Sequence, residues 1–388
     1  MEANPKTSLP GPIPQLLNKL LHRPPLSFLS YGIFWSFFLI VLSPLAGAVL
    51  TLITAYKTVR YIILLPFGLE DGEKIKAVAS SEGDAIELAV LITGCDSGFG
   101  YDLALGLASK GFVVFAGCLR KESWEQFAGI NKIKPLQMDI TDDTEVADAE
   151  AQVRKWFEND KGRRFFHALV NNAGIGSSGR IDWIKLEAYR SIMEVNYFSM
   201  IRVTQTFLPI MKSQRISRSY NDARIINITS AAGLIAMDGG SLYAGSKFAA
   251  EAFSTCLRHE CEAFGVHVAT VNPSFHTSNL TGQMGPHIIR LLDTLRPEVK
   301  EEYGEEYFQQ YYNNQVEMPQ KVMWDGSNVR DEIIRCIELK VPPPQVVIGL
   351  DARFMILAIR HLPVWLQDIF LFNTGGPSRK VKPSCMIG

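Results

Sequence analysis

Between residues 83 and 350, short apolar runs alternate with longer stretches in which apolar residues recur at helical spacing. A run that is apolar throughout is typical of a strand buried on both faces of a parallel sheet. The runs predict seven strands, at Ile86–Thr93, Phe112–Cys118, Ile133–Met138, Phe166–Val170, Ala223–Thr229, Val266–Val271 and Gln345–Gly349. Strands separated by helices indicate an α/β protein with a doubly wound parallel sheet.

The stretches between these runs predict helices at Asp102–Ser109, Asp142–Asn159, Leu186–Met211 and Tyr243–Phe264. From Thr277 to Lys340 the alternation is lost, and the sequence there predicts a helical insertion. The expected organisation is a tail (1–25), a membrane anchor (26–66), a core (83–278), a helical substrate-side insertion (279–345), and a last strand with an apolar helix and a tail (346–388).

The anchor is predicted from Leu26 to Tyr56, a stretch without a charged residue. A membrane-spanning helix needs about 20 apolar residues, and this stretch is longer. Because Ser43-Pro44 interrupts it, one kinked span and a hairpin both remain open. A cleaved signal peptide and a buried core helix are the alternatives to a retained anchor.

A second apolar segment, Phe354–Phe372, contains Arg360, His361 and Asp368 and does not favour a membrane span. A helix packed on the core is one interpretation of it. The other is an interfacial helix that rests on a membrane beside the substrate entrance.

Composition narrows the class of partner. With 39 basic and 40 acidic residues the net charge is −1, which argues against binding to the phosphates of nucleic acid. The six cysteines include no Cys-x-x-Cys pair, so neither a disulfide scaffold nor a zinc ribbon is expected. The histidines show no paired metal spacing, and no metal site is predicted.

A glycine-rich turn joins the first strand to the first helix, Thr93-Gly94-Cys95-Asp96-Ser97-Gly98-Phe99-Gly100. Glycine permits positive φ and lets backbone N–H groups approach a pyrophosphate at the helix N-terminus. In this position the turn predicts dinucleotide binding. NAD-selective sites usually have an acid at the end of the second strand, where this chain has Cys118, followed by Arg120 and Lys121. The residues alone leave NAD and NADP both open.

Tyr243 and Lys247 are four residues apart, which places them on one face of a helix. Ser230 follows the fifth strand, and Asn196 lies in the preceding helix. A cation and a positively charged nicotinamide near Tyr243 would favour its phenolate, so that the phenol can exchange a proton near neutral pH. Ser230 would hold the substrate oxygen, and Asn196 could order a water between Lys247 and solvent.

These motifs occur in the order typical of the short-chain dehydrogenase/reductase family, which this chain resembles from about Gly83 to Ser278. The resemblance implies a Rossmann fold and catalytic roles for Asn196, Ser230, Tyr243 and Lys247. The expected cofactor contacts are Thr93, Gly94, Asp96, Ser97, Gly98, Phe99, Gly100, Cys118, Asp139, Asn172, Ala173, Gly174, Tyr243, Lys247, Pro273 and Thr277.

The glycine turn and Phe115-Ala116-Gly117-Cys118-Leu119 are similar to the membrane-associated branch, which includes retinol dehydrogenases, 17β-hydroxysteroid dehydrogenases of type 2 and mitochondrial 3-hydroxybutyrate dehydrogenase. That branch mostly uses NAD without an acid at the second strand, which favours NAD and keeps NADP as a second possibility. In one departure, Ser274 follows Pro273 where the family usually has glycine.

The sequence therefore predicts a membrane-bound enzyme that interconverts an alcohol and a carbonyl on a lipophilic substrate such as a hydroxysteroid or retinoid. The endoplasmic reticulum is the expected location, with a mitochondrial membrane as the alternative, and a homodimer is possible. A 3-hydroxybutyrate dehydrogenase is the second hypothesis within enzymes. A non-catalytic dinucleotide-binding scaffold at a membrane is the hypothesis from another class.

Overall fold

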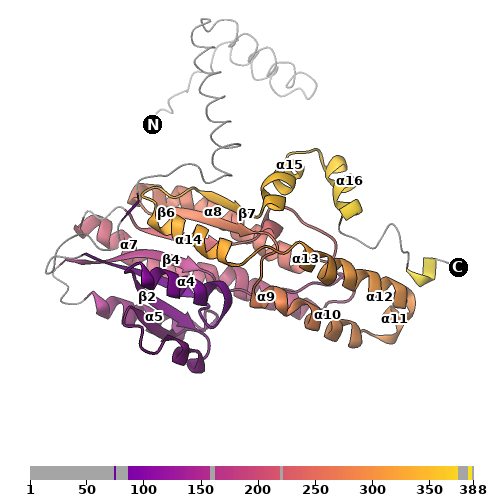
Figure 1. The fold of residues 1–388 in the computed structure, drawn as a ribbon, viewed down its shortest axis with the longest axis horizontal. Helices are drawn as coiled ribbons and strands as arrows, with labels where there is room; N and C mark the ends of the chain where they lie inside the picture. Colours follow the sequence, from indigo (N-terminus) through magenta and orange to yellow (C-terminus); the bar gives the residue numbers. More distant parts are fainter. Residues whose placement is uncertain (1–73, 76–85, 158–161, 219–221, 375–382, 387–388) are drawn as a thin grey trace, which may run out of the picture. The chain divides into compact units, whose positions relative to one another are not determined.

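The computed structural model describes residues 74–75, 86–157, 162–218, 222–374 and 383–386. Seven parallel strands form one sheet in the order β3-β2-β1-β4-β5-β6-β7 (Figure 1). They are β1 (Glu87–Thr93), β2 (Val113–Cys118), β3 (Ile133–Gln137), β4 (Arg164–Asn171), β5 (Arg224–Ile228), β6 (His267–Pro273) and β7 (Gln345–Ile348). The predicted doubly wound sheet is confirmed. Because the chain order reverses between β1 and β4, the carboxyl ends of these two strands border a crevice that is open to a ligand.

Helices cover both faces of the sheet. On one face, α4 (Gly98–Ser109) packs against α14 (Ser327–Glu338), and apolar side chains of both enter the core cluster around Val90 and Val114. On the other face lie α5 (Asp143–Trp156), α7 (Ser199–Arg218) and α8 (Ser241–Cys261). Both faces of the strands are therefore buried, which is why their sequences are apolar without alternation.

The single helix predicted for Leu186–Met211 is interrupted. The structure has α6 (Leu186–Met193), a π-helical turn η4 (Glu194–Phe198), and then α7. The extra residue in a π turn changes the direction of the side chains that follow, and such turns are frequent at functional sites. Asn196 lies inside this one.

A group of short helices follows β6 and lies together beyond one end of the sheet (Figure 1). It consists of α9 (Asn279–Gly282), α10 (Met284–Asp293), α11 (Pro297–Tyr303), α12 (Glu305–Tyr312), η7 (Asn313–Glu317) and α13 (Met318–Lys321). Their own small core is built around Trp183, Tyr307 and Tyr311. The segment predicted as an insertion, 279–345, also contains α14, which belongs to the main core.

The C-terminal apolar segment forms three pieces rather than one helix: η8 (Ala352–Ile356), α15 (Leu357–Arg360) and α16 (Val364–Thr374). Pro363 precedes α16, where its ring is incompatible with a continuing helix. Ile356 and Leu357 pack against the core cluster that contains Val347, whereas Val364 and Trp365 are 71% and 64% exposed. The packed-helix interpretation thus holds for the start of the segment and not for the exposed side chains of α16.

No helix within the described ranges is both long enough and apolar enough to cross a membrane. The anchor predicted for 26–66 lies outside the described residues.

A buried cation ties α14 to the sheet. Arg224, at the start of β5, is 0% exposed, and its Nη1 donates to the carbonyl oxygens of Cys336 (3.0 Å), Ile337 (2.9 Å) and Leu339. The last carbonyls of a helix have no partner within the helix, and they carry partial negative charge. Arg224 therefore caps the carboxyl end of α14 from the first residue of β5.

Candidate active site

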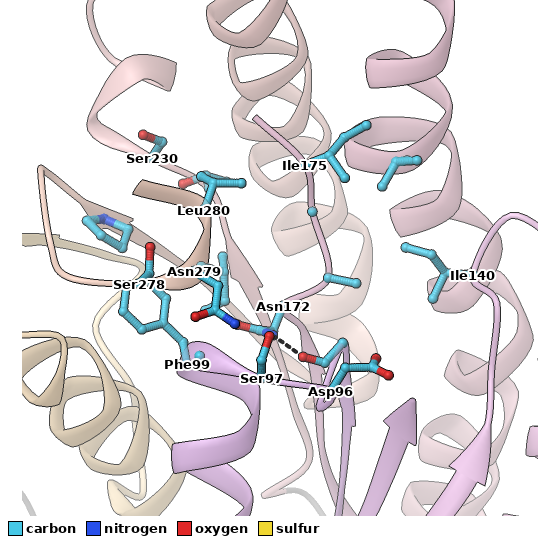
Figure 2. A pocket seen from close by; sticks show the side chains of 18 of the residues that line it. Asp96, Ser97, Phe99, Ile140, Asn172, Ile175, Ser230, Ser278, Asn279 and Leu280 are labelled. Carbon is cyan, nitrogen blue, oxygen red and sulfur yellow. Dashed lines mark hydrogen bonds between the residues drawn. The ribbon is translucent and has the colours of Figure 1, made fainter. Parts of the chain in front are cut away.

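A cleft of about 480 Å³ lies along the carboxyl ends of the strands (Figure 2). Most of the residues singled out from the sequence line it: Gly94, Asp96, Ser97, Gly98, Phe99, Asp139, Asn172, Ala173, Gly174, Ser230, Tyr243, Lys247 and Pro273. Five others do not reach its wall: Thr93, Gly100, Cys118, Asn196 and Thr277. Each of these five holds a neighbouring segment in place or packs behind it.

The glycine turn forms a cradle. Gly94 has φ +71°, and a Cβ there would lie 2.9 Å from Cα of Ala173. A Cβ on Gly100 would clash with the carbonyl oxygen of Gly94. Side chains are thus excluded where the turn meets the helix. Ser97 begins α4 without a side-chain cap, which leaves the N–H groups of the first turn for a ligand. These groups fit the pyrophosphate of a dinucleotide.

The end of β2 differs from the expectation for Cys118. That side chain is fully buried and points back to the carbonyl oxygen of Ala116, so it does not contact the cleft. The nearby acid is Asp96, whose carboxylate accepts hydrogen bonds from the backbone N–H groups of Leu119 (2.9 Å) and Arg120 (3.0 Å). The carboxylate beside the end of β2 therefore comes from Asp96 of the glycine turn and not from the strand itself.

Thr93 and Asn172 join β1 to β4. The Thr93 hydroxyl accepts from the N–H groups of Asn172 and Ala173, both at 3.0 Å, and Asn172 Nδ2 donates to the carbonyl oxygen of Thr93 at 2.9 Å. These bonds hold the two strand ends together beneath the crevice. Thr93 therefore shapes the cofactor cleft without lining it.

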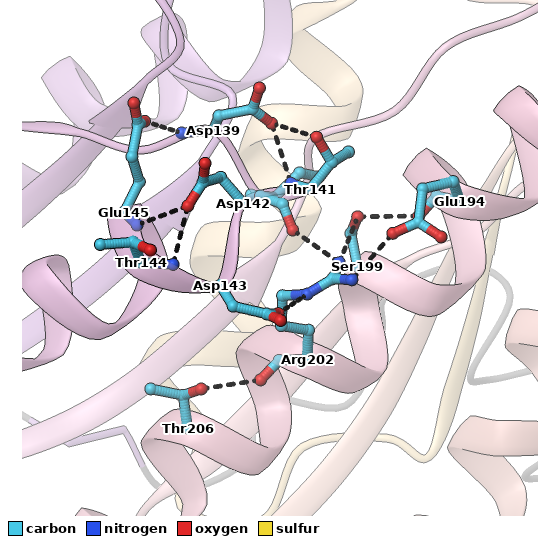
Figure 3. A network of polar contacts seen from close by, with 11 residues as sticks. Asp139, Thr141, Asp142, Asp143, Thr144, Glu145, Glu194, Ser199, Arg202 and Thr206 are labelled. Carbon is cyan, nitrogen blue, oxygen red and sulfur yellow. Dashed lines mark hydrogen bonds and ion pairs between the residues drawn. The ribbon is translucent and has the colours of Figure 1, made fainter.

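Asp139 belongs to a polar network behind the cleft (Figure 3). Its Oδ1 accepts from the N–H and hydroxyl of Thr141, at 2.8 and 2.7 Å. Across the network, Arg202 donates to the carbonyl oxygen of Ile140 (3.0 Å) and to Oε1 of Glu194 (2.9 Å). The loop after β3 is thereby linked to the π turn that contains Asn196.

Tyr243, Lys247 and Ser230 meet above the end of β5. Lys247 Nζ lies 5.7 Å from the centre of the Tyr243 ring and donates to the carbonyl oxygen of Ile228 at 3.1 Å. Ser230 Oγ accepts from the N–H of Ala232, and this bond fixes its hydroxyl at the cleft wall. The phenol, the ammonium and the hydroxyl predicted from the sequence are thus brought together.

Burial dominates the electrostatics of this cluster. Burial raises the pKa of Tyr243 above its usual value, and a hydrogen bond with Ser230 opposes that rise. Burial lowers the pKa of Lys247 to about 8, and the charge of Glu251 opposes that fall. Without a cofactor, the pKa of Tyr243 therefore stays above its usual value although Lys247 is close. The phenolate expected from the sequence would also depend on the positive charge of a bound nicotinamide.

The Asn196 side chain is held by hydrogen bonds behind the cleft. Its amide oxygen accepts from the N–H of Ile175, and its Nδ2 donates to the carbonyl oxygen of Ile175 and to Ser246 Oγ, at 2.9 to 3.0 Å. The side chain is 1% exposed. It ties the loop after β4 to α8, so it positions the site, and the structure does not favour its amide as a ligand for a relay water.

The loop after β6 is held by hydrogen bonds to later segments of the chain, around residues 324–326 and 351. Ser274 Oγ donates to Asp351 Oδ1 at 2.9 Å, and Trp324 Nε1 donates to the same oxygen. Thr277 accepts through Oγ1 from the N–H of Gly326 at 2.9 Å. Ser274, which replaces the family glycine, therefore links the loop to the segment after β7.

The cleft is also lined by residues that the sequence analysis did not assign to the site: Leu119, Met138, Ile140, Thr141, Ile175, Val195, Ile228, Thr229, Ser274, His276, Ser278, Asn279, Leu280 and Thr281. Figure 2 shows Ile175 and Leu280 among the side chains around the pocket. Most of them are adjacent in the sequence to a predicted site residue, either just before or just after it. Position just after a strand end was the signal available for them, since every βα loop of a parallel sheet reaches the same edge.

Comparison with known proteins agrees with this geometry. The family model described as short chain dehydrogenase matches residues 88–288. Human dehydrogenase/reductase SDR family member 9 is 32% identical over 75% of this chain and 89% of its own length. Mouse mitochondrial D-beta-hydroxybutyrate dehydrogenase is 34% identical (68% and 77%), and mouse retinol dehydrogenase 16 is 32% identical (74% and 88%).

Solved structures show the same fold. A short-chain dehydrogenase/reductase from Burkholderia phymatum in complex with NAD has a TM-score of 0.56 at 20% identity, covering 76% of this chain and 99% of its own. One from Burkholderia cenocepacia in complex with NADP has a TM-score of 0.55 at 20% identity, covering 74% and 98%. The chain belongs to the short-chain dehydrogenase family. It is an NAD(P)-dependent oxidoreductase of that family.

Proposed function

We propose that the protein interconverts an alcohol and a carbonyl group on a lipophilic hydroxysteroid-like or retinoid-like substrate, at the cluster of Ser230, Tyr243 and Lys247. In the oxidising direction, Tyr243 takes the proton of the substrate hydroxyl while the C–H bond of the carbinol breaks. A nicotinamide cofactor held in the cleft would supply the acceptor for the hydride that leaves this carbon. Ser230 donates a hydrogen bond to the substrate oxygen, and Lys247 stabilises the phenolate through its charge. The convergence of these three groups carries the proposal.

Apolar surface beside this cluster supports a lipophilic substrate. Ile175 and Leu280 line the cleft and are each 39% exposed, so both can lose contact with water when a substrate binds. They come from the loop after β4 and from α9, two segments that meet near Gly176. An apolar substrate would thus extend between these segments, with its hydroxyl toward Tyr243.

Asp96 supports a preference for NAD over NADP. Its carboxylate is held beside the first residues after β2, where the adenosine ribose of a dinucleotide is read in this fold. A carboxylate there accepts hydrogen bonds from the ribose hydroxyls and repels a 2′-phosphate. Arg120 is 3.8 Å from the same carboxylate and 68% exposed, so solvent weakens its attraction for a phosphate.

A small hydroxy acid such as 3-hydroxybutyrate is the second candidate, because a 34% identical relative has that name. Its carboxylate would need a cation in the cleft. The basic residues that line the described cleft are Lys247 and His276. Burial lowers the pKa of His276, which favours its neutral form, and Lys247 already serves Tyr243. The apolar substrate is favoured for this reason.

Turnover measurements would test the proposal. Full-length protein purified in detergent would be supplied with NAD or NADP and with hydroxysteroid, retinol or 3-hydroxybutyrate. We expect reduction of NAD with a steroid or retinoid alcohol, at a kcat/KM at least about 10-fold above that with 3-hydroxybutyrate. A higher kcat/KM with 3-hydroxybutyrate would contradict the lipophilic substrate, and no cofactor reduction with any alcohol would contradict the enzymatic proposal.

We also propose that residues 26–66 anchor the enzyme in the membrane of the endoplasmic reticulum, which would bring the cleft close to a lipid-dissolved substrate. The support is the long uncharged run from Leu26. After alkaline carbonate extraction, full-length protein is expected in the membrane pellet and a chain starting at Ser80 in the supernatant. Full-length protein in the supernatant would contradict the anchor.

A further inference from the structure

Glu251 lies one helical turn beyond Lys247 on α8, and the mechanism above gives it no part. Its Oε1 accepts a hydrogen bond from the Thr229 hydroxyl and one from Asn272 Nδ2 at 2.6 Å. Its Oε2 accepts from Gln345 Nε2 at 3.0 Å and lies 3.4 Å from the Thr270 hydroxyl. A surface carboxylate on a helix does not usually collect four donors from another layer of the protein.

These donors come from three neighbouring strand segments. Thr229 follows β5 and directly precedes Ser230, Thr270 and Asn272 belong to β6, and Gln345 begins β7. Asn272 is 0% exposed, and its Nδ2 also donates to Thr229 Oγ1 at 2.7 Å and to the carbonyl oxygen of Ser230 at 3.3 Å. The carboxylate therefore fixes the helix that bears Tyr243 and Lys247 to the strand ends that bear Ser230 and the loop after β6.

The carboxylate of Glu251 also acts on Lys247 through its negative charge. From α8, the titratable groups that face Lys247 are Tyr243 and Glu251. From β5 it meets the carbonyl oxygen of Ile228, and Gly174 of the loop after β4 lies close to its Nζ. Among the described groups that act on Lys247, Glu251 is the one with negative charge. The donors to Glu251 are all neutral, so its own charge is not cancelled by a partner in the network.

We propose that Glu251 is a positioning residue for the reaction: its carboxylate holds α8 in register with the strand ends that bear Ser230, and it places a negative charge one helical turn from Lys247. This inference rests on the proposed function for its catalytic consequence, but the state of Lys247 can be measured without turnover. Burial lowers the pKa of Lys247, and the negative charge of Glu251 opposes this effect. Without that charge the pKa of Lys247 is expected to fall further. The ammonium is then lost at a lower pH, because a negative neighbour favours the charged form of an amine.

Glu251→Gln removes the charge and keeps an amide oxygen that can accept from Thr229 and Asn272. Glu260→Gln is the matched control, because Glu260 is an exposed glutamate on the same helix and far along it from Lys247. Gln345→Lys is a second variant at an exposed strand end, and it adds a cation where Gln345 contacts Glu251. The added cation offsets part of the negative charge of Glu251, and the sequence of α8 stays unchanged.

The experiment measures the rate at which acetic anhydride acetylates Lys247 as a function of pH, by peptide mass spectrometry of the full-length protein without cofactor. Only the free amine reacts, so the midpoint of the rate reports the titration of Lys247. We expect a midpoint about 1 pH unit lower in E251Q than in the wild type. A smaller shift in the same direction is expected in Q345K, and none in E260Q. Unchanged midpoints in E251Q and Q345K would overturn the proposal, as would an equal shift in E260Q.

Kinetics separate this inference from the proposed function. In the wild type, kcat/KM plotted against pH is expected to fall on the alkaline side near the acetylation midpoint of Lys247. In E251Q, both this fall in kcat/KM and the acetylation midpoint are expected at lower pH. If the wild type turns over and the fall in kcat/KM stays at the same pH in E251Q, the role of Glu251 in catalysis is refuted while the function stands. If the wild type does not turn over, the function is refuted, and the acetylation midpoints still decide whether Glu251 controls Lys247.

Discussion

Replacing Tyr243 with phenylalanine is expected to lower kcat for alcohol oxidation by about 10²- to 10⁴-fold, with little change in the affinity for NAD. In the proposed reaction the phenol oxygen removes the substrate proton, and general acid–base groups contribute factors of this size. The ring itself stays in place, because Phe has the same shape without the oxygen. Cofactor affinity would be measured by the fluorescence of bound NADH, and kcat by the appearance of NADH.

Tyr189→Phe is the control for this change. Tyr189 donates to or accepts from Ser241 Oγ at 2.6 Å, at the start of the same helix α8, and it does not line the cleft. Its variant is expected to keep kcat within about 2-fold of the wild type. Wild-type turnover in the Tyr243 variant would refute the assignment of the proton acceptor.

Replacing Arg224 with methionine is expected to lower the free energy of unfolding by about 3 kcal/mol or more. Methionine fills part of the space but cannot donate to the carbonyl oxygens of Cys336, Ile337 and Leu339. Buried acceptors that lose their donor retain the cost of desolvation. The same change removes the positive charge that opposes the dipole at the end of α14. Urea unfolding followed by circular dichroism would measure the difference.

Arg215→Met is the matched control for Arg224, since Arg215 is exposed on α7. It is expected to change the free energy of unfolding by less than about 0.5 kcal/mol. Equal effects of the two substitutions would show that the contacts of Arg224 do not stabilise α14.

The sheet could be predicted from the sequence because its strands are buried on both faces. The predicted strand ends agree with the structure within two residues in every case. The π turn at Glu194–Phe198 could not be predicted, because it depends on a local shift of backbone hydrogen bonds that leaves no pattern in residue type. The place of α14 was missed for another reason: its apolar face does not reveal which core it packs on.

The candidate site, like the fold, could be predicted from the sequence only in part. Motif residues that follow strand ends were found, since topology alone carries them to one edge. The direction of the Cys118 side chain could not be predicted, because the sequence places a residue at a strand end but does not show whether its side chain turns into the core or toward the cleft. Glu251 was missed because a glutamate four residues after a lysine usually marks an exposed helix face. Its four donors come from segments that are distant in sequence and meet it only in the folded protein.

The late position of β7 in the chain bears on how the enzyme is made. β6 is synthesised before the group of short helices and α14, and only then does its neighbour β7 leave the ribosome. During that interval one side of β6 is an open edge, able to pair with another nascent chain. Ribosomes that stall before Gln345 should therefore release aggregation-prone chains, and a chaperone that covers this edge would raise the yield of folded enzyme.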